Sequence, residues 1–412
     1  GFDVVPHPGN SRYGYAMSQG GNVGRYDLLT GHTQFIKPVH PDGERLRFNW
    51  NAAIAQDPHD EDAIYYGSQY LHYSTDRGNN WKIISPDLTT NDPEKQKQNK
   101  SGGLTYDATG AENFTTIIAI APSPINRNVI WVGTDDGNVQ LTQDRGKTWE
   151  NVSKRIFGPP DGSWIPQITA STYDPKEAVV VINNYRRNDW KPYAFRTTNY
   201  GKSWKAIADE DNVWGYVLSY VQDPLEPNLQ FLGTEFGLYV SIDGSKTWTK
   251  WTSGFPTVST MDLKIHPREH DLVIGTFGRA AYILDDIRAL REMAASNEDL
   301  MKKRLHFFEP PVAVLSINRQ ASGTRFEANA IFSGQNRKRG AMLTFVYNPG
   351  KKKPETKKRE DSGIKKDDAK KKKEKVKLEV LDSDGKIIRT VKYDVEPGVN
   401  RIYWDLRRKG VR

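Results

Sequence analysis

Short apolar stretches separated by polar turns run through most of the first 285 residues, a pattern typical of β-strands rather than helices. The runs VIWVGT (129–134) and NVQLTQ (138–143) flank Asp135-Asp136-Gly137 and predict a hairpin. Another apolar run precedes each of several prolines, as in NAAIAQDP (51–58) and VLSYVQDP (217–224). The pattern therefore predicts units of four short strands, at intervals of about 45 to 65 residues.

Four segments of the chain repeat one order of features, namely a proline turn, a strand pair and a turn that ends in tryptophan. The proline-to-tryptophan offsets are similar, at 23, 25, 29 and 24 residues (Pro58–Trp81, Pro124–Trp149, Pro175–Trp204, Pro224–Trp248). A fifth copy from His266 lacks the tryptophan turn, and a degenerate sixth copy lies at residues 7–35. Four-stranded units repeated radially make a β-propeller, so we predict an all-β fold of this type.

The tryptophan turns follow the pattern Ser/Thr-x-Asp-x-Gly-x-x-Trp, at residues 74–81, 142–149, 197–204 and 241–248. The carboxylate can accept backbone N–H groups across the turn, the glycine permits a positive φ, and the tryptophan can pack between blades. In the third copy Asn199 replaces the acid, and in the fourth Gly244 comes one place early, so looser turns are expected there. We predict structural rather than metal-binding or catalytic roles for Asp76, Gly78, Trp81, Asp144, Gly146, Trp149, Asn199, Gly201, Trp204, Asp243 and Trp248.

These turns, with AENFTTIIAIAPSP (111–124), VIWVGTDDGNVQLTQDRGKTW (129–149) and DLVIGTFGRAAYILDD (271–286), make residues 1–290 resemble a known family. The chain is similar to the Asp-box (BNR-repeat) propellers of bacterial secreted proteins, which are sortilin-like (VPS10-type) or glycosyl hydrolase-like. The resemblance implies a propeller of seven to ten blades. Because five or six copies are counted, the chain is expected to be the C-terminal part of such a propeller. No basic and apolar leader opens the sequence, which also favours a processed chain or a piece of a longer one.

A second region follows the repeats. Residues 291–304 predict a helical connector, and residues 305–412 predict another β-domain in which Asp384-Gly385 joins two alternating strands as a hairpin. This region resembles the immunoglobulin- or fibronectin-like sandwich that follows such propellers. The sequence stops soon after Trp404, so we expect the sandwich to be incomplete.

Charge and composition exclude several classes of function. The net charge is +8, but residues 351–375 alone carry +7 in a Lys-rich segment that is expected to be a solvated, dispensable loop, so we predict no nucleic-acid partner. The chain contains no Cys, which removes disulfides, zinc ribbons and thiol nucleophiles. Its histidines are scattered, and no run is apolar enough for a membrane-spanning helix. We therefore expect neither a metal nor a cofactor.

The repeat sorts the loops between two rims. The box rim carries the tryptophan turns and the proline turns. The opposite rim carries the loops between the second and third strands and the segments that join blades. Aromatic rings with nearby charges suit sugars or peptides. The candidate ligand-binding residues on the opposite rim are Glu112, Asp135, Asp136, Trp164, Tyr185, Arg186, Trp190, Trp214, Glu235 and Arg279.

Two functions fit this sequence. The first is a secreted or outer-membrane-associated propeller, with a possible place in a larger cell-surface assembly, that binds a protein, peptide or glycan through the opposite rim. The alternative is a glycoside hydrolase of xyloglucanase or sialidase type, with part of its active site in N-terminal blades outside this chain. A glycosidase needs two carboxylates at about 5 to 9.5 Å, a separation that a sequence does not reveal. We therefore favour binding over catalysis and assign no catalytic residue.

Overall fold

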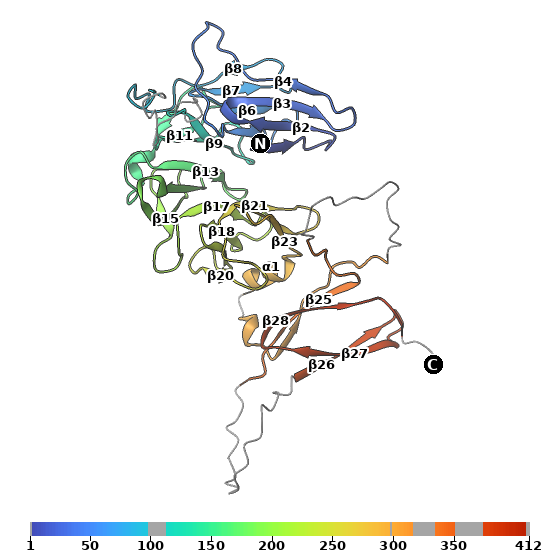
Figure 1. The fold of residues 1–412 in the computed structure, drawn as a ribbon. Coiled ribbons are helices and arrows are strands. Elements are labelled where there is room, and N and C mark those ends of the chain that lie inside the picture. The colour runs from blue at the N-terminus through green and yellow to red at the C-terminus, as the bar shows by residue number, and fades with distance from the viewer. Residues whose placement is uncertain (1, 98–112, 297–298, 316–333, 351–373, 409–412) are drawn as a thin grey trace. The chain divides into compact units, whose positions relative to one another are not determined.

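The computed structural model describes residues 2–97, 113–296, 299–315, 334–350 and 374–408. The chain divides into two compact units (Figure 1). The first comprises Gly1–Pro267 with Leu272–Leu284, and the second comprises Arg268–Asp271 with Asp285–Arg412. Glu112 and residues 351–373 of the predicted Lys-rich loop lie outside the described residues.

The described part of the first unit contains five four-stranded antiparallel sheets and one of three strands. In each, the strands follow one another in chain order, so that neighbours in sequence are neighbours in the sheet. The first two sheets are β1 (Val4–Pro6), β2 (Tyr13–Ser18), β3 (Asn22–Asp27), β4 (Thr33–Phe35), and β5 (Ile54–Gln56), β6 (Ile64–Gly67), β7 (Leu71–Ser74), β8 (Lys82–Ile83).

The next sheets keep this plan. The third and fourth are β9 (Ile117–Pro122), β10 (Ile130–Thr134), β11 (Val139–Thr142), β12 (Glu150–Asn151), and β13 (Trp164–Ala170), β14 (Ala178–Asn184), β15 (Asp189–Thr197), β16 (Lys205–Ala208). The last two are β17 (Val217–Gln222), β18 (Gln230–Thr234), β19 (Gly237–Ser241), β20 (Thr249–Trp251), and β21 (Thr260–Ile265), β22 (Leu272–Thr276), β23 (Ala281–Leu284). Short 3-10 turns occur at η1 (Gln19–Gly21), η3 (Ser153–Arg155) and η4 (Tyr185–Arg187).

The sheets pack face to face in the order of the chain. The first strand of one sheet contacts the first strand of the next, from β5 to β9, β13, β17 and β21. Apolar side chains fill the space between them, and Leu141 of β11 shares a core with Val180 of β14. This arrangement is consistent with propeller blades, as the repeat predicts, and the copy without a tryptophan turn forms the sheet of three strands.

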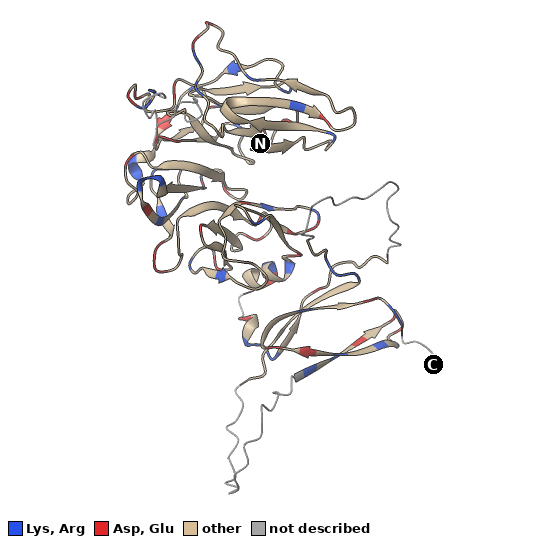
Figure 2. Cartoon of the chain, in the orientation of Figure 1, with Lys and Arg blue, Asp and Glu red and all other residues tan. Residues whose placement is uncertain are grey.

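The central strands are buried on both faces. All residues of β10 and β11 are buried, including Trp131 and its cross-strand partner Leu141. The alternation read from the sequence therefore does not separate a core face from a solvent face here, because a neighbouring sheet covers each side. Charged residues of both signs are interspersed around the strands (Figure 2).

The second unit contains α1 (Arg288–Ala295), η5 (Leu300–Lys302) and five strands in its described part. One sheet has the order β24–β25–β28, and β26 pairs with β27. Their bounds are β24 (Leu305–Phe307), β25 (Ala341–Tyr347), β26 (Glu374–Leu381), β27 (Ile387–Val395) and β28 (Gly398–Trp404). Gly385, at a φ of 76°, turns the chain between β26 and β27 as the Asp-Gly pair predicts. The immunoglobulin- or fibronectin-like sandwich remains a prediction.

Neither α1 nor the 3-10 turns of the described residues is long and apolar enough to cross a lipid bilayer.

Candidate ligand-binding site

The polar groups of each box turn form hydrogen bonds with one another inside the turn. One Asp144 carboxylate oxygen accepts from the Thr142 hydroxyl at 2.8 Å and from the Thr148 amide at 2.9 Å, while the other accepts from the Thr148 hydroxyl at 2.6 Å. The Gly146 amide donates back to the Thr142 hydroxyl at 2.9 Å. The Thr148 hydroxyl and amide lower the pKa of Asp144 to about 2. The Asp144 carboxylate therefore stabilises the turn in which it lies.

The two atypical boxes close with bonds at the same positions, one of them reversed in direction, which corrects the expectation that they are looser. The Asn199 carbonyl oxygen accepts from the Ser203 amide at 3.0 Å, and its amide group donates to the Ser203 hydroxyl at 2.8 Å. In the fourth box Ser245 takes the place of the glycine at a φ of 70°, and its amide donates to Ser241 at 2.9 Å. The backbone geometry of the turn thus tolerates both substitutions.

The tryptophans of the boxes do not all behave alike. The indole N–H donates to a carbonyl of the preceding sheet in three of them, from Trp81 to Ile36, Trp149 to Ile84 and Trp248 to Ile207. The Trp204 indole nitrogen is buried and lacks such a bond within the described structure.

At Trp204 the preceding sheet is followed by a 3-10 turn. The residue of the preceding sheet that corresponds to Ile36 and Ile84 is Val152, which packs against Gly201 of the third box. The Val152 carbonyl accepts the Arg155 amide at 3.1 Å as η3 begins. The Trp204 ring instead meets the edge of Trp131, with centroids 5.9 Å apart.

On the opposite rim, three rings from two loops form a contiguous aromatic cluster. Tyr185 of η4 stacks on Tyr216, which precedes β17, with centroids 4.4 Å apart and planes at 16°. Trp190 of β15 lies 5.6 Å from Tyr216 and 6.5 Å from Tyr185. The Trp190 side chain is 52% exposed, so this cluster offers an aromatic surface to solvent.

Arg186 extends the aromatic cluster toward Trp164. Its guanidinium carbon lies 3.6 Å from the centroid of the Trp164 ring and 4.6 Å from that of Tyr185. Trp164 in turn lies 6.1 Å from Phe114, with Lys95 Nζ at 5.3 Å from the Phe114 centroid. Cations over ring faces are attracted by the quadrupole of the ring.

A second exposed pair lies on the next loop of this rim. Trp214, which is 61% exposed, stacks on Phe236 with centroids 4.3 Å apart. Lys250 Nζ lies 5.2 Å from the Trp214 centroid. This pair gives the rim a second flat apolar face with an adjacent positive charge.

Glu235 connects neighbouring sheets. One of its carboxylate oxygens accepts from the Tyr216 hydroxyl at 2.5 Å and from the Ser259 hydroxyl at 2.8 Å. Burial and this carboxylate raise the pKa of Tyr216 above its ordinary value. Glu235 therefore fixes the position of the Tyr216 ring through its hydroxyl, a role that the sequence alone does not indicate.

Asp135 and Asp136 lie buried beneath the rim surface. Asp135 accepts from the Thr116 amide and hydroxyl at 2.9 and 2.5 Å and from the Asn49 side chain at 2.9 Å. Burial, and then the charge of Asp136, raise the pKa of Asp135 to about 8. Asp136 accepts from the Thr90 amide and hydroxyl and from the Thr134 hydroxyl. Both carboxylates thus hold loops together in this structure.

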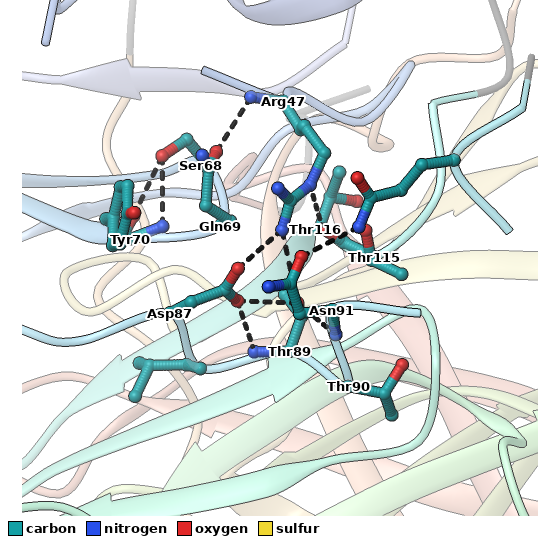
Figure 3. Close-up of polar contacts among 12 residues, drawn as sticks. Arg47, Ser68, Gln69, Tyr70, Asp87, Thr89, Thr90, Asn91, Thr115 and Thr116 are labelled. Atoms are coloured by element: carbon teal, nitrogen blue, oxygen red, sulfur yellow. Dashed lines mark hydrogen bonds and ion pairs between the residues drawn. The ribbon is translucent and has the colours of Figure 1, made fainter. Parts of the chain in front are cut away.

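Figure 3 shows the polar network that continues from these loops and that the sequence reasoning missed. Arg47 donates to the Asp87 carboxylate at 2.6 Å and to the Thr115 carbonyl at 3.2 Å. Asp87 accepts from the Thr89 amide and hydroxyl at 2.9 and 2.6 Å. Thr115 has a φ of 59°, a strained value for a β-branched residue, where it approaches this network. No spacing in the sequence relates Arg47 to Asp87.

The structure links five of the ten predicted ligand-binding residues through contacts. Contacts link Trp164, Tyr185, Arg186 and Trp190, and Glu235 joins them through Tyr216. Arg279 is exposed in the turn between β22 and β23, and no contact among the described residues connects it to this cluster. A hollow of about 220 Å³ lies instead at the box rim, between the third and fourth boxes, lined by Arg196, Trp204, Lys205 and Lys246 among others. Among the described residues no group of three or more His, Asp or Glu side chains is arranged to hold a metal ion.

Comparison with known proteins finds distant relatives. No protein-family model matches the chain. A curated probable oligoxyloglucan-reducing end-specific xyloglucanase of Neosartorya fischeri is 22% identical over 227 residues, which are 54% of this chain and 26% of that protein. The chain thus spans well under half of the length of this relative.

Solved structures of glycoside hydrolases of family GH74 are similar to this chain. The GH74 enzyme of Niastella koreensis has a TM-score of 0.47 at 13% identity, covering 75% of this chain and 48% of that one. The GH74 xyloglucanase of Xanthomonas campestris has a TM-score of 0.39 at 15% identity, covering 76% and 56%. An ancestral GH74 enzyme has a TM-score of 0.39 at 13% identity, covering 87% and 39%.

The relatives bear on the two functions that the sequence left open. The curated relative is a probable xyloglucanase, which is the glycosyl hydrolase-like side of the resemblance and the alternative function. The relatives lend no support to the sortilin-like side or to an immunoglobulin-like module.

Proposed function

We propose that this chain is the glycan-binding part of an extracellular β-propeller glycoside hydrolase, and that it binds a polysaccharide along the opposite rim. The observation that carries the proposal is the exposed Trp190 ring, which packs against Tyr185 and the buried Tyr216, followed by the exposed Trp214 ring stacked on Phe236. The apolar C–H faces of sugar rings stack on flat aromatic rings, and successive rings suit a polymer.

The rings are held in place before any ligand arrives. Glu235 fixes the Tyr216 hydroxyl, the Trp190 indole N–H donates to the Asn188 side chain at 3.0 Å, and the Tyr239 hydroxyl accepts the Trp214 amide at 3.0 Å. A preorganised surface loses little side-chain entropy on binding. This rigidity favours a site over incidental exposure of aromatic residues.

A xyloglucan-type ligand is the first choice for this surface. The curated relative, a probable oligoxyloglucan-reducing end-specific xyloglucanase, matches about half of the chain. Because such polymers lie outside cells, the proposal includes an extracellular location. We further propose that the second unit is a β-module appended to the propeller.

Hydrolysis is proposed for the whole protein rather than for the carboxylates of this rim. Glu235 is engaged by Tyr216 and Ser259, and both Asp135 and Asp136 are buried. A glycosidase instead presents two carboxyl groups to the scissile bond. The proposal therefore places at least one catalytic carboxylate outside these three residues.

Calorimetric titration of the intact chain with xyloglucan oligosaccharides tests the proposed binding. Trp190→Ala and Trp214→Ala are each expected to weaken binding by about 1–3 kcal/mol, the range of an aromatic anchor. Leu225→Ala is the control, because this residue is exposed in the proline turn between β17 and β18 on the box rim. Undiminished affinity in both tryptophan variants, or binding of a peptide rather than any glycan, would refute the proposal.

A further inference from the structure

The hollow at the box rim lies where the repeat departs most from its own pattern. Residues of the third and fourth boxes line it, and these are the boxes in which Asn199 replaces the acid and Ser245 takes the place of the glycine. Arg196, which also lines the hollow, is a third departure. The residues just ahead of the other three boxes carry no charge, namely Tyr73, Leu141 and Val240.

The lining of the hollow is positively charged. The described residues that line it include Arg196, Lys205 and Lys246 and no carboxylate. Arg196 and Lys205 are direct cross-strand partners in β15 and β16, and like charges in such a pair destabilise a sheet. Glu177 forms an ion pair with Arg196 at 3.2 Å, whereas neither lysine forms an ion pair with a described residue. The two lysines therefore remain available to an anion.

The acids next to these lysines in the sequence are engaged elsewhere. Asp243 accepts from the Ser241 and Thr247 hydroxyls at 2.8 and 2.6 Å, inside the fourth box. Asp209 accepts from two backbone amides of the turn that follows β16, each at 3.1 Å. Both carboxylates stabilise their own turns, and neither lines the hollow.

The asparagine of the third box leaves a hydroxyl donor at the hollow. In the second box the Thr148 hydroxyl donates to Asp144 at 2.6 Å. In the third box the Ser203 amide, which can only donate, fixes the Asn199 oxygen at 3.0 Å, so the Asn199 amide group donates to the Ser203 hydroxyl at 2.8 Å. This reversed bond leaves the hydroxyl hydrogen of Ser203, a lining residue, to donate to another acceptor.

Arg196 fixes the walls of the hollow. Its guanidinium donates to the Gly244 carbonyl at 3.3 Å, to the Ser245 hydroxyl at 3.0 Å and to the Gln230 side chain at 2.7 Å. These bonds attach the fourth box to β15 and set the distance between the two boxes. A site whose walls are already held in place loses little conformational entropy when a ligand binds.

From this geometry we propose that the hollow binds a doubly charged oxyanion, namely sulfate, phosphate or a phosphate ester, held by Lys205, Lys246 and the Ser203 hydroxyl. Two lysines without ion-pair partners match its two charges, and charge-assisted hydrogen bonds to such oxygens are strong. The volume of about 220 Å³ admits more than a single water, and Trp204 offers an apolar wall to a sugar that carries the anion. The site lies on the box rim and does not depend on the proposed function.

The test is calorimetric titration of the intact chain with inorganic phosphate, inorganic sulfate, glucose 6-phosphate and acetate. We expect at least one of the doubly charged ligands to bind about tenfold tighter than acetate at low salt, the effect of one further charge-assisted hydrogen bond. The difference is expected to shrink as salt is raised. Tighter binding of glucose 6-phosphate than of inorganic phosphate would identify an ester as the ligand, and the reverse order would identify the free ion.

Lysine substitutions locate the anion. Lys205→Gln and Lys246→Gln are each expected to weaken binding of the doubly charged ligand about tenfold. Lys147→Gln is the matched control, because Lys147 occupies the place of Lys246 in the second box, is exposed and does not line the hollow. It is expected to leave the affinity unchanged.

Asn199→Asp tests the site without removing a cation. An acid at this position would draw the Ser203 hydroxyl hydrogen back into the turn and add a negative charge beside the hollow, so we expect binding to weaken at least about tenfold. The melting temperature should not fall, since the acid is the usual residue of the box. This second readout separates a lost donor from a misfolded turn.

The outcomes are decisive for the inference alone. It would be overturned if neither doubly charged ligand class showed saturable binding, or if acetate bound as tightly as both. Undiminished affinity in both lysine variants, or in Asn199→Asp, would also overturn it. Trp190→Ala should leave anion binding intact, so failure of the glycan proposal on the opposite rim would not affect this site.

Discussion

The two rims of the first unit are built on different principles. At the box rim, one set of hydrogen bonds recurs in four turns, including the two whose sequences depart from the pattern. At the opposite rim each contact occurs once, as with the Glu235–Tyr216 bond or Arg186 over Trp164. Both rims belong to the same sheets and are reached by the same strands.

The difference shows where the chain can vary. A box turn bonds mainly to itself, so its structure survives the change of Asp to Asn199 or of Gly to Ser245. A loop of the opposite rim is positioned by its neighbours, and its sequence can therefore diverge to suit a ligand. Binding sites are commonly carried by loops on a rigid scaffold for this reason.

The substitution expected to lower the free energy of unfolding most lies in a box turn. Gly146 has a φ of 90°, and a Cβ there would lie 2.5 Å from the Ile84 carbonyl oxygen. Gly146→Ala is therefore expected to lower the free energy of unfolding by about 3 kcal/mol, since it adds both backbone strain and a clash. Urea unfolding measures this change.

The matched variant Gly201→Ala should cost less than Gly146→Ala, because the nearest atom there is a Val152 side chain at 3.1 Å, which can shift. Equal losses in the two variants would contradict the argument that backbone contacts set the tolerance of each box.

The opposite rim is expected to lose stability as the pH rises toward 8, whereas the lowered pKa of Asp144 at the box rim affects stability only at acid pH. In the folded state the pKa of Asp135 is raised to about 8, whereas its unfolded value is near 3.8. Between these values the folded state retains a proton that the unfolded state has lost, so stability falls as pH rises, by up to about 1.4 kcal/mol per pH unit. Burial lowers the pKa of His72 to about 4, which acts in the reverse direction only below its ordinary 6.5.

The effect of Asp135 is therefore isolated by measuring urea midpoints from pH 6.5 to pH 8. Asp135→Asn should remove most of the decline in stability over this interval, and Asp161→Asn, at an exposed carboxylate of the same rim, should not. The same slope in the wild type and in Asp135→Asn would show that Asp135 is ionised in the folded protein.

The box tryptophans differ in their hydrogen bonds, so their substitution is expected to destabilise the protein by different amounts. Trp248→Phe removes the hydrogen bond to the Ile207 carbonyl, whereas Trp204→Phe removes an indole N–H that has no such bond. We expect Trp248→Phe to be the more destabilising by about 1 kcal/mol, the net contribution of one hydrogen bond. Thermal melts of the two variants would disprove this if Trp204→Phe proved the more damaging.

The smallest change in stability is expected for a substitution in the third box. Asn199→Asp restores the usual acid to the third box, where the Thr197 hydroxyl and both Ser203 donors are available to it. Because Asn199 already satisfies this turn, the gain should stay below about 1 kcal/mol. A melting temperature raised by more than a few degrees would mean that the asparagine turn is the weaker one after all.

The sequence by itself determined the local parts of this protein. The strand hairpins, the boxes and the Asp384-Gly385 turn follow from periodicity and turn chemistry, which act over a few residues. The division of loops between two rims follows from the same repeat. It assigned Trp164, Tyr185, Arg186 and Trp190 to one rim, and contacts link these four side chains in the structure.

Only the tertiary structure decided what each side chain does once it is there. Asp135 and Asp136 were expected to contact a ligand, but they are buried and hydrogen-bond to neighbouring loops instead. Packing also brings Arg47 to Asp87 and Lys95 close to Arg187. The Trp204 indole N–H has no hydrogen-bond partner in the described structure, unlike those of the other box tryptophans. Such roles depend on distances between residues far apart in the chain, because the strength of burial and charge effects is set by the neighbours in space.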